Sequence, residues 1–354
     1  MSSFMPGLEL SRRFYAEVIA PILAQKGPGL PYSAALIGDG SEVLGFDTEM
    51  SADHCWGPRV LLFLGEDADA GLREDLTARL LAALPPTFCG YATRIAPPEQ
   101  SAAAQYTVQI FTLRGFFRDY LAFEIEREIA PADWLTFPEQ KLRAITSGAV
   151  FHDEVGLQAV RERFAYYPRD VWLYLLAAGW TRIGQEEHLM GRAGFVGDEV
   201  GSAIIGARLA RDLMRLGFLM ARQYAPYPKW FGTAFARLPC GPDLLPVLKR
   251  VLQASTWQER ENHLVAAYET IAAWHNRLGI TEPRPEKAAV FFDRPFRVIE
   301  LSGGFAEAIC AHIEDPDVQH MARKRLIGSI DQFSDSTDLL SDPGWRETLR
   351  GLYS

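Results

Sequence analysis

Residues 36–64, LIGDGSEVLGFDTEMSADHCWGPRVLLFL, indicate the fold and the candidate site. An apolar segment enters a Gly-Asp-Gly-Ser turn, a loop of mixed polar character follows, and Asp53 stands shortly before a second apolar strand. Glycine lets the backbone come close to a phosphate, and Ser41 with the neighbouring amides can donate hydrogen bonds to phosphate oxygens. A carboxylate beside the next strand can hold a cation that bridges such oxygens. The stretch therefore predicts a phosphate site at Gly38, Gly40 and Ser41, with Asp53 as a metal ligand.

The same residues also have structural explanations. The glycines can form a plain turn, and Asp53 can cap a strand or lie on the surface. Asp47 and Glu49 are typical solvated loop residues, although carboxylates opposite Asp53 are also how general acid–base catalysis is arranged. We expect Trp56 to serve packing rather than base stacking, and Cys55 to be a small buried residue.

Around this stretch, the first third of the sequence mixes helix and strand patterns. Apolar residues at helical spacing alternate with short apolar or alternating segments. The predicted elements are helices over 8–26 and 72–84 and strands over 34–37, 59–64 and 106–110. This combination predicts a small mixed-sheet α/β domain over residues 1–131.

From residue 132 onward strand patterns fade, and helical periodicity dominates. The predicted helices cover 155–166, 169–182, 201–224, 243–254, 256–277 and 304–313. We therefore expect a helical-bundle domain over residues 132–354 and an α+β protein as a whole. Asp153 is expected to cap the first of these helices.

Several polar segments of the helical half have simple expected roles. Residues 184–192 and the acidic stretch 331–343 are expected to be exposed to solvent. Four arginines follow one stripe of the predicted 201–224 helix, namely Arg208, Arg211, Arg215 and Arg222. Such a stripe is usually a solvated face, and closure over an anionic substrate is the alternative.

The composition excludes several classes of protein. The sequence of 354 residues has 36 Lys and Arg against 45 Asp and Glu, a net charge of −9, which disfavours long nucleic acid as a partner. Four scattered cysteines predict reduced thiols and a cytoplasmic protein. The longest apolar run, residues 171–180, falls well short of the roughly 20 residues that a membrane span requires. The first residues lack a signal-peptide pattern, so we expect no membrane association.

The order Gly-Ser, spacer, Asp-x-Asp resembles the polymerase-beta-like nucleotidyltransferase superfamily. The runs GSEVLGFDTEMSADHCWGPR, WLTFPEQKL, GAVFHD and YAPYPKWFGTAF resemble a family of nucleotidyltransferase-like bacterial proteins of uncharacterised function. The resemblance covers most of the chain and implies a fold like that of kanamycin nucleotidyltransferase, in which a short mixed sheet precedes a helical bundle. It also implies that Gly40 and Ser41 cradle phosphates and that Asp53 binds Mg²⁺.

The sequence departs from the superfamily at two of its three carboxylates. The second residue of the Asp-x-Asp pair falls on Cys55, and a thiol is a poor Mg²⁺ ligand. The third carboxylate belongs on the third strand, where this sequence offers Thr107 and Gln109. The standard two-metal mechanism uses both of these carboxylates, whereas the implied fold does not depend on them.

The resemblance implies transfer of a nucleoside monophosphate from a nucleoside triphosphate to a small-molecule hydroxyl or amine. Two alternatives stay open, since fold alone does not decide function. One is a metal-independent hydrolase or lyase of a sugar- or nucleotide-containing metabolite, with Asp53 and either Asp47 or Glu49 as the acid–base pair. The other is a non-catalytic nucleotide-binding module.

Overall fold

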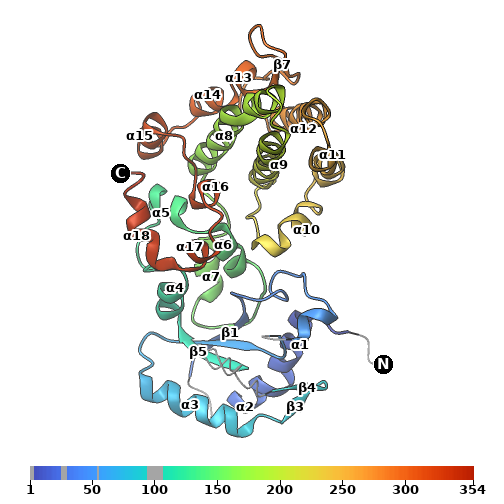
Figure 1. The fold of residues 1–354 in the computed structure, drawn as a ribbon. Helices are drawn as coiled ribbons and strands as arrows, with labels where there is room; N and C mark the ends of the chain where they lie inside the picture. The colour runs from blue at the N-terminus through green and yellow to red at the C-terminus, as the bar shows by residue number, and fades with distance from the viewer. Residues whose placement is uncertain (1–3, 25–29, 54–55, 94–106) are drawn as a thin grey trace. The chain divides into compact units, whose positions relative to one another are not determined.

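The structure, a computed structural model, describes residues 4–24, 30–53, 56–93 and 107–354, with the backbone alone for residues 52 and 53. The chain divides into two compact units (Figure 1). The first consists of Met1–Glu128 and Lys141–Ala165, and the second of Ile129–Gln140 and Tyr166–Ser354. A mixed sheet forms the first unit and helices dominate the second, so the predicted α+β class is confirmed. The predicted domain boundary at residues 131–132 stays a prediction.

The first unit is built on a four-stranded sheet. Its strands are β1 (Tyr32–Leu36), β2 (Val60–Leu64), β5 (Val108–Thr112) and β6 (Ala149–Asp153), in the order β5-β2-β1-β6. Strand β1 pairs antiparallel with β2 and β6, and β2 pairs parallel with β5. The three predicted strands are confirmed as β1, β2 and β5. The expectation that strand patterns fade from residue 132 is wrong for β6, in which only the first three residues are apolar and His152 and Asp153 follow.

Strand β2 lies inside the sheet and is buried along its whole length, which explains its continuous apolar sequence. On one face of the sheet its side chains join α3 (Ala70–Ala83) and the first helices in a common core. That core includes Phe14, Ile19, Ala34, Val60, Leu62, Leu76 and Leu80. Phe63, which alternates to the other face, packs its ring 5.3 Å from the ring of Phe116, between centroids. Both faces of the sheet are therefore covered by apolar contacts.

Short helices complete the first unit. They are α1 (Gly7–Phe14), the π-helical η1 (Tyr15–Ile19), α2 (Ala20–Ala24), the 3₁₀-helical η2 (Glu49–Asp53), α4 (Leu113–Leu121) and α7 (Leu157–Glu162). A hairpin of β3 (Thr87–Phe88) and β4 (Tyr91–Ala92) precedes β5, and α6 (Glu139–Thr146) precedes β6. The predicted first helix is confirmed over residues 7–24. Its π-helical turn lies just before Pro21, which has no N–H to continue the regular hydrogen-bond pattern.

Asp153 joins two strands and a helix of the first unit. Its Oδ1 accepts hydrogen bonds from the Ser33 hydroxyl at 2.5 Å and from the N–H of Leu157 at 2.9 Å, while its Oδ2 accepts from the N–H of Gln158 at 2.9 Å. Burial alone would raise the pKa of Asp153, but these hydrogen bonds outweigh burial and lower it. The predicted capping role of Asp153 is confirmed.

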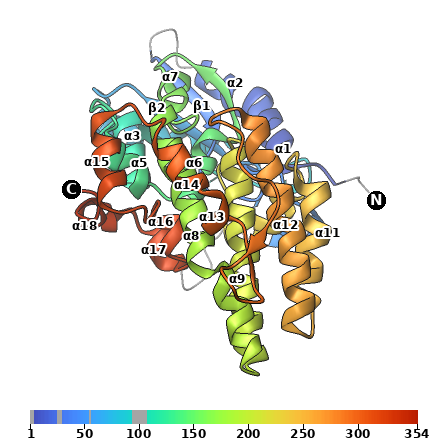
Figure 2. The ribbon, with the colours of Figure 1, turned by 90° about the horizontal axis from the view of Figure 1, so that it is seen from above.

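Long helices form the second unit. The four longest are α8 (Arg169–Phe195), α9 (Glu199–Met220), α11 (Gly241–Gln253) and α12 (Trp257–Leu278), which lie side by side (Figures 1 and 2). The others are α5 (Pro131–Thr136), η3 (Pro228–Trp230), α10 (Phe231–Phe235), α13 (Glu300–Gly303), α14 (Phe305–Cys310), α15 (Pro316–Lys324), α16 (Ile330–Phe333), α17 (Thr337–Ser341), η4 (Pro343–Trp345) and α18 (Arg346–Arg350), with a hairpin of β7 (Ala289–Val290) and β8 (Arg297–Val298). The helices predicted in this half are confirmed, and α8 runs 13 residues beyond its predicted end at 182.

Two segments expected to be exposed contain buried acids. In residues 184–192, Glu187 is buried and accepts hydrogen bonds from the N–H of Ile299 at 2.6 Å and of Leu301 at 2.9 Å, which fixes the start of α13. In residues 331–343, Asp331 is buried and its Oδ2 accepts from the N–H of Glu139 at 2.9 Å. The expectation is wrong for these residues because backbone donors that are distant in sequence satisfy each carboxylate.

The arginine stripe of α9 is not a plain solvated face either. Arg208, Arg211 and Arg215 take part in ion pairs. Arg222 lies beyond the end of α9, where its guanidinium is 4.1 Å from the ring centroid of Trp172.

In the part of the chain that the structure describes, no helix is both long and apolar enough to cross a membrane. Cys89, Cys240 and Cys310 are free thiols.

Two buried ionisable groups of the second unit have shifted pKa values. His275 packs beside the rings of Trp180 and Phe305, and its burial lowers its pKa to about 4. Burial raises the pKa of Glu300 to about 7, although the N–H groups of Phe305 and Ala306 donate to its carboxylate. Folded His275 thus resists protonation, whereas folded Glu300 retains its proton to higher pH.

Asp153→Ala should lower the free energy of unfolding by about 2 kcal/mol, because α7 loses its cap and the buried Ser33 hydroxyl loses its acceptor. Urea unfolding at pH 7 measures the change. Glu162→Gln, on the exposed side of the same helix, is the matched control and should change little. Equal effects of the two substitutions would contradict the role of Asp153.

Opposite pH dependences should separate His275 from Glu300. The unfolded values are about 6.5 for His and 4.5 for Glu, so the stability that neutral His275 contributes is lost as pH falls from about 6.5 to 4. The contribution of protonated Glu300 is lost as pH rises from about 4.5 to 7. The quantity to follow is the unfolding free energy of each variant minus that of the parent protein. As the pH is raised from 5 to 7, this difference should increase by about 2 kcal/mol for Glu300→Gln and decrease by about 2 kcal/mol for His275→Gln. Parallel pH profiles of the two variants in urea unfolding would disprove this assignment.

Candidate functional site

The predicted phosphate turn begins two residues after β1. Gly38 has a φ of +87°, and its N–H donates to the carbonyl oxygen of Ala144 at 3.0 Å. Gly148, just before β6, donates its N–H to the carbonyl oxygen of Val43 at 3.0 Å. A side chain at Gly148 would collide with the carbonyl oxygen of Leu36. Backbone contacts with residues 144–148 therefore fix both sides of the turn.

Gly40 is required by a buried ion pair beneath the turn. Its φ is +145°, and a Cβ atom there would lie 2.6 Å from Arg59 Nη2 and 2.7 Å from Glu42 Oε2. Arg59 and Glu42 form an ion pair, and Arg59 Nη2 also donates to the carbonyl oxygen of Asp39 at 2.9 Å. The Glu42 side chain is only 1% exposed, so it depends on Arg59 for charge compensation.

The turn presents backbone donors. Within the described part of the chain, the N–H groups of residues 40–44 have no hydrogen-bond acceptor, and the Ser41 hydroxyl has no partner. Gly40, Ser41 and Leu44 are half-buried, whereas Glu42 and Val43 are buried. Backbone N–H groups in proteins are rarely left without an acceptor. Successive free N–H groups in a turn suit an anion such as a phosphate.

Two residues that the sequence did not indicate lie beside this turn. The Tyr120 hydroxyl, from α4, donates to Asp39 Oδ1 at 2.7 Å, and the Lys141 ammonium lies 4.1 Å from the centroid of the Tyr120 ring. Burial and the neighbouring Asp39 carboxylate hold the pKa of Tyr120 well above its usual value, so the hydroxyl stays protonated and donates. Tyr120 is 81 residues from Asp39, and no local pattern reveals such a pair. Arg59 did carry a signal, as a charged residue directly before a buried strand.

Asp47, in the loop after the turn, accepts hydrogen bonds from donors outside the turn. Its Oδ2 accepts hydrogen bonds from the N–H of Gly7 at 2.7 Å and from the indole N–H of Trp56 at 3.1 Å. Gly7 is packed so tightly that a Cβ atom there would lie 2.7 Å from Glu42 Cβ. A carboxylate at the start of α1 is also favourable for the helix dipole. Trp56 is buried and stacks on Phe4 with centroids 5.7 Å apart, so its predicted packing role is confirmed.

The other predicted acids lie in or next to η2. Glu49, its first residue, is exposed and has no hydrogen bond or ion pair among the residues described. Asp53 ends η2, and its side chain lies outside the described part of the chain, as do His54 and Cys55. In the described part, no three His, Cys, Asp or Glu side chains are grouped to hold a metal ion. The Mg²⁺ role of Asp53 therefore stays a prediction.

Strand β5 and the residue before it have an amide and a hydroxyl where the family has an acid. Thr107 is buried and its hydroxyl donates to the carbonyl oxygen of Thr93, while Gln109 is half-buried and lies opposite Leu61 of β2. The structure thus brings together Gly38, Gly40, Ser41 and Asp47 around the Glu42–Arg59 pair. Glu49 has no hydrogen bond or ion pair to them among the residues described.

Comparisons with known proteins relate the chain to a family model and to solved structures. A domain of unknown function, DUF4037, matches residues 134–231. Among solved structures, the chain is similar to a nucleotidyltransferase-like protein from Exiguobacterium sibiricum 255-15, with 10% sequence identity and a TM-score of 0.34 over 76% of this chain and 75% of that chain. No curated protein matches the chain.

Gly40→Ala should destabilise the protein more than Gly45→Ala. Both glycines have positive φ, which costs about 1 kcal/mol for alanine, but only Gly40 would bring its new Cβ against the Arg59–Glu42 pair. Displacing a buried ion pair adds about 2 kcal/mol or more. Thermal and urea unfolding of both variants measure the difference. A larger effect at Gly45 would mean that Gly40 is not needed for the ion pair.

Proposed function

We propose that the protein is a nucleotidyltransferase-like enzyme that transfers a nucleoside monophosphate from a nucleoside triphosphate to a small-molecule hydroxyl or amine. One observation carries this proposal. The N–H groups of residues 40–44 and the Ser41 hydroxyl lack acceptors among the described residues, so the turn after β1 has free donors of the kind that suit an anion. The loop after this turn leads to Asp53, the acid that the sequence places before the next strand.

The charges around the turn suggest how a triphosphate is held. Arg59 is paired with Glu42, so the pair adds no net charge beneath the phosphates. The Lys141 ammonium lies close to the ring of Tyr120, whose hydroxyl donates to Asp39 of the turn. The backbone N–H groups then supply most of the hydrogen bonds to phosphate oxygens. In this proposal Asp53 holds Mg²⁺, which when bound neutralises part of the phosphate charge.

The chain's own residues orient the reaction. Ser41 and the free N–H groups hold the phosphates, while the acceptor hydroxyl or amine attacks the α-phosphorus. A new bond forms between the acceptor and the α-phosphorus, the bond from this phosphorus to the bridging oxygen breaks, and pyrophosphate leaves with those electrons. Glu49, an exposed acid of the same loop, is our candidate to take the proton that the acceptor releases. Asp47 positions α1 and Trp56 in the same loop.

The hydrolase or lyase alternative is less well supported. It requires Asp47 or Glu49 to work with Asp53 as an acid–base pair. However, Asp47 Oδ2 already accepts two hydrogen bonds, which favours a positioning role.

We further propose that the protein is cytoplasmic, as its dispersed cysteines led us to expect.

Calorimetric titration with each of the four common nucleoside triphosphates, with and without Mg²⁺, tests the proposal. We expect Mg²⁺-dependent binding that Asp53→Asn abolishes and that Ser41→Ala weakens about tenfold, the effect of one hydrogen bond to a charged group. Thr48→Ala, in the same loop but exposed, is the matched control and should bind as the parent protein does.

Product analysis of the same mixtures separates the alternatives. Release of pyrophosphate in the presence of a panel of amines and hydroxyl compounds would support transfer. No binding at millimolar triphosphate would exclude transfer and favour the hydrolase or lyase. Binding without turnover of any panel compound would favour the non-catalytic module.

A further inference from the structure

The second unit contains an open cavity of about 440 Å³ between α8, α9 and the segment 326–335. Cationic and amide side chains dominate its polar lining, which comprises Arg182, Gln185, Arg208, Arg211, Gln332 and Asp335. The ring of Phe333, which is partly exposed, also lines it. The cavity has no role in the proposed reaction at the Gly-Asp-Gly-Ser turn, because all its lining residues belong to the second unit.

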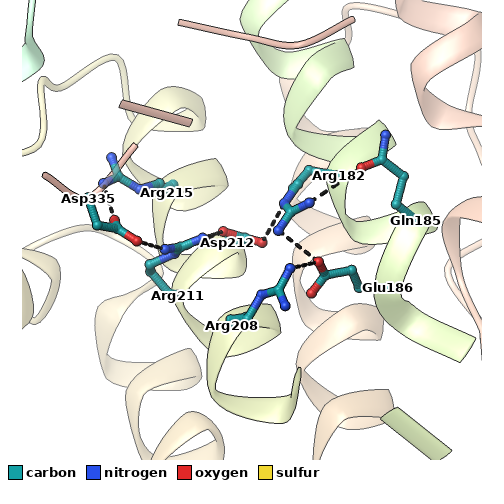
Figure 3. A network of polar contacts seen from close by, with 8 residues as sticks. All are labelled: Arg182, Gln185, Glu186, Arg208, Arg211, Asp212, Arg215 and Asp335. Atoms are coloured by element: carbon teal, nitrogen blue, oxygen red, sulfur yellow. Dashed lines mark hydrogen bonds and ion pairs between the residues drawn. The ribbon is translucent and has the colours of Figure 1, made fainter. Parts of the chain in front are cut away.

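Helical spacing brings the arginines together. On α9, Arg208 and Arg211 are three residues apart and share a face, and Arg182 projects from α8 toward them (Figure 3). Arg182 Nη2 lies 2.7 Å from Glu186 Oε1, and Arg208 pairs with the same carboxylate. Arg182 and Arg208 therefore share one acid between the two helices.

A second acid holds the other side of the cluster. Arg211 donates through Nε and Nη2 to Asp212 Oδ1, at 3.1 and 2.9 Å, and Arg182 Nε lies 3.5 Å from Asp212 Oδ2. Glu186 and Asp212 are both buried, so these acids fix the guanidinium planes from behind. Such fixed planes are suited to bind an anion without further ordering.

Asp335 completes the charge balance from the solvent side. It pairs with Arg211, and its Oδ1 lies 3.6 Å from Nη2 of Arg215, which also interacts with the buried Asp331. Three cavity arginines thus face three carboxylates. Two of these acids are buried, whereas the Asp335 side chain is 60% exposed and lies between α16 and α17. Asp335 is the member of this set that an anion from solvent can replace.

Arg208 has capacity beyond the network. Its side chain is 44% exposed, and its Nε and Nη1 have no acceptor among the described residues. An ion-pair network that only joined α8 to α9 would not require a 440 Å³ opening beside these donors. A tetrahedral dianion fits both features, because two guanidinium groups can bind it from adjacent sides.

We propose that this cavity binds the phosphate group of a small metabolite. Arg208 and Arg211 contact the phosphate, Arg182 supports them, and the Asp335 carboxylate competes with the phosphate for Arg211. The exposed ring of Phe333 lies where the organic part of the metabolite can pack. The inference is independent of nucleotidyl transfer at the turn.

Calorimetric titration of the full chain with inorganic phosphate and with phenyl phosphate tests the proposal, in chloride buffer without nucleotide or Mg²⁺. Arg208→Gln should weaken binding of both probes about tenfold, the effect of one charge-assisted hydrogen bond. Asp335→Asn should tighten binding several-fold because it removes the internal competitor. Arg192→Gln, the same change at an exposed site on α8, should leave binding unchanged.

Ser41→Ala distinguishes this site from the turn in the first unit, and it should leave phosphate affinity at the cavity unchanged. Asp335 is exposed, so its variant tests the proposal even where a substitution at Arg208 disturbs folding. Loss of binding in Ser41→Ala with none in Arg208→Gln would place the phosphate at the turn and overturn the proposal. Weaker binding in Asp335→Asn would also overturn it, since Asp335 would then support the site.

Discussion

The buried ion pair between Glu42 and Arg59 is the constraint on which the candidate site depends. A carboxylate that is 1% exposed is stable only if its charge is compensated, and loss of one partner of such a pair costs about 3–5 kcal/mol. Glu42 follows β1 and Arg59 precedes β2, so the pair closes the loop between two neighbouring strands. A Cβ atom at position 40 would collide with the side chains of the pair, and one at position 7 would collide with Glu42, so both positions are glycine. The shape of the turn thus depends on the charge pair, and the start of α1 packs against the Glu42 side chain.

A similar rule governs the second unit, where acids enter the interior of the helical bundle. Glu187 caps the start of α13 from within α8, and Glu186 and Asp212 each compensate arginines. Burial of an unpaired carboxylate is costly, so each of these acids has donors that come from other turns or other helices. The acidic composition of the chain is therefore used partly for internal structure. Net charge alone does not show where negative charge meets solvent.

Sequence patterns predicted the elements that have strong periodicity, because burial of one face depends on residue spacing alone. Strand β2 and the helices α3, α9 and α12 are examples. Strand β6 was missed, since only its first three residues are apolar and its pairing partner, β1, lies more than 110 residues earlier. The extension of α8 was missed because Glu186 and Glu187 looked like surface residues, and their partners are distant in sequence.

The sequence predicted which residue types form the candidate site, but it did not predict which of them contact one another. The sequence suggested that position 40 is glycine because a phosphate comes close to the backbone there. The structure gives a more direct reason, since a side chain at this position would collide with Glu42 and Arg59. Asp47 was grouped with acid–base candidates, whereas its partners are an N–H forty residues away and an indole. Tyr120 and Lys141 carry no local signal. Contacts of this kind depend on the folded sheet and not on neighbouring sequence.

Strand β6 has a consequence for synthesis of the protein on the ribosome. The sheet is complete only when residues 149–153 pair with β1, and Asp153 then joins Ser33 to α7. Until those residues leave the ribosomal tunnel, one edge of β1 has no strand beside it, and an open edge can pair with another chain. Residues 129–140, which are made before β6, belong to the second unit. The first unit therefore finishes folding after synthesis of the second has begun, and a nascent chain that stalls in this interval carries an unprotected sheet edge.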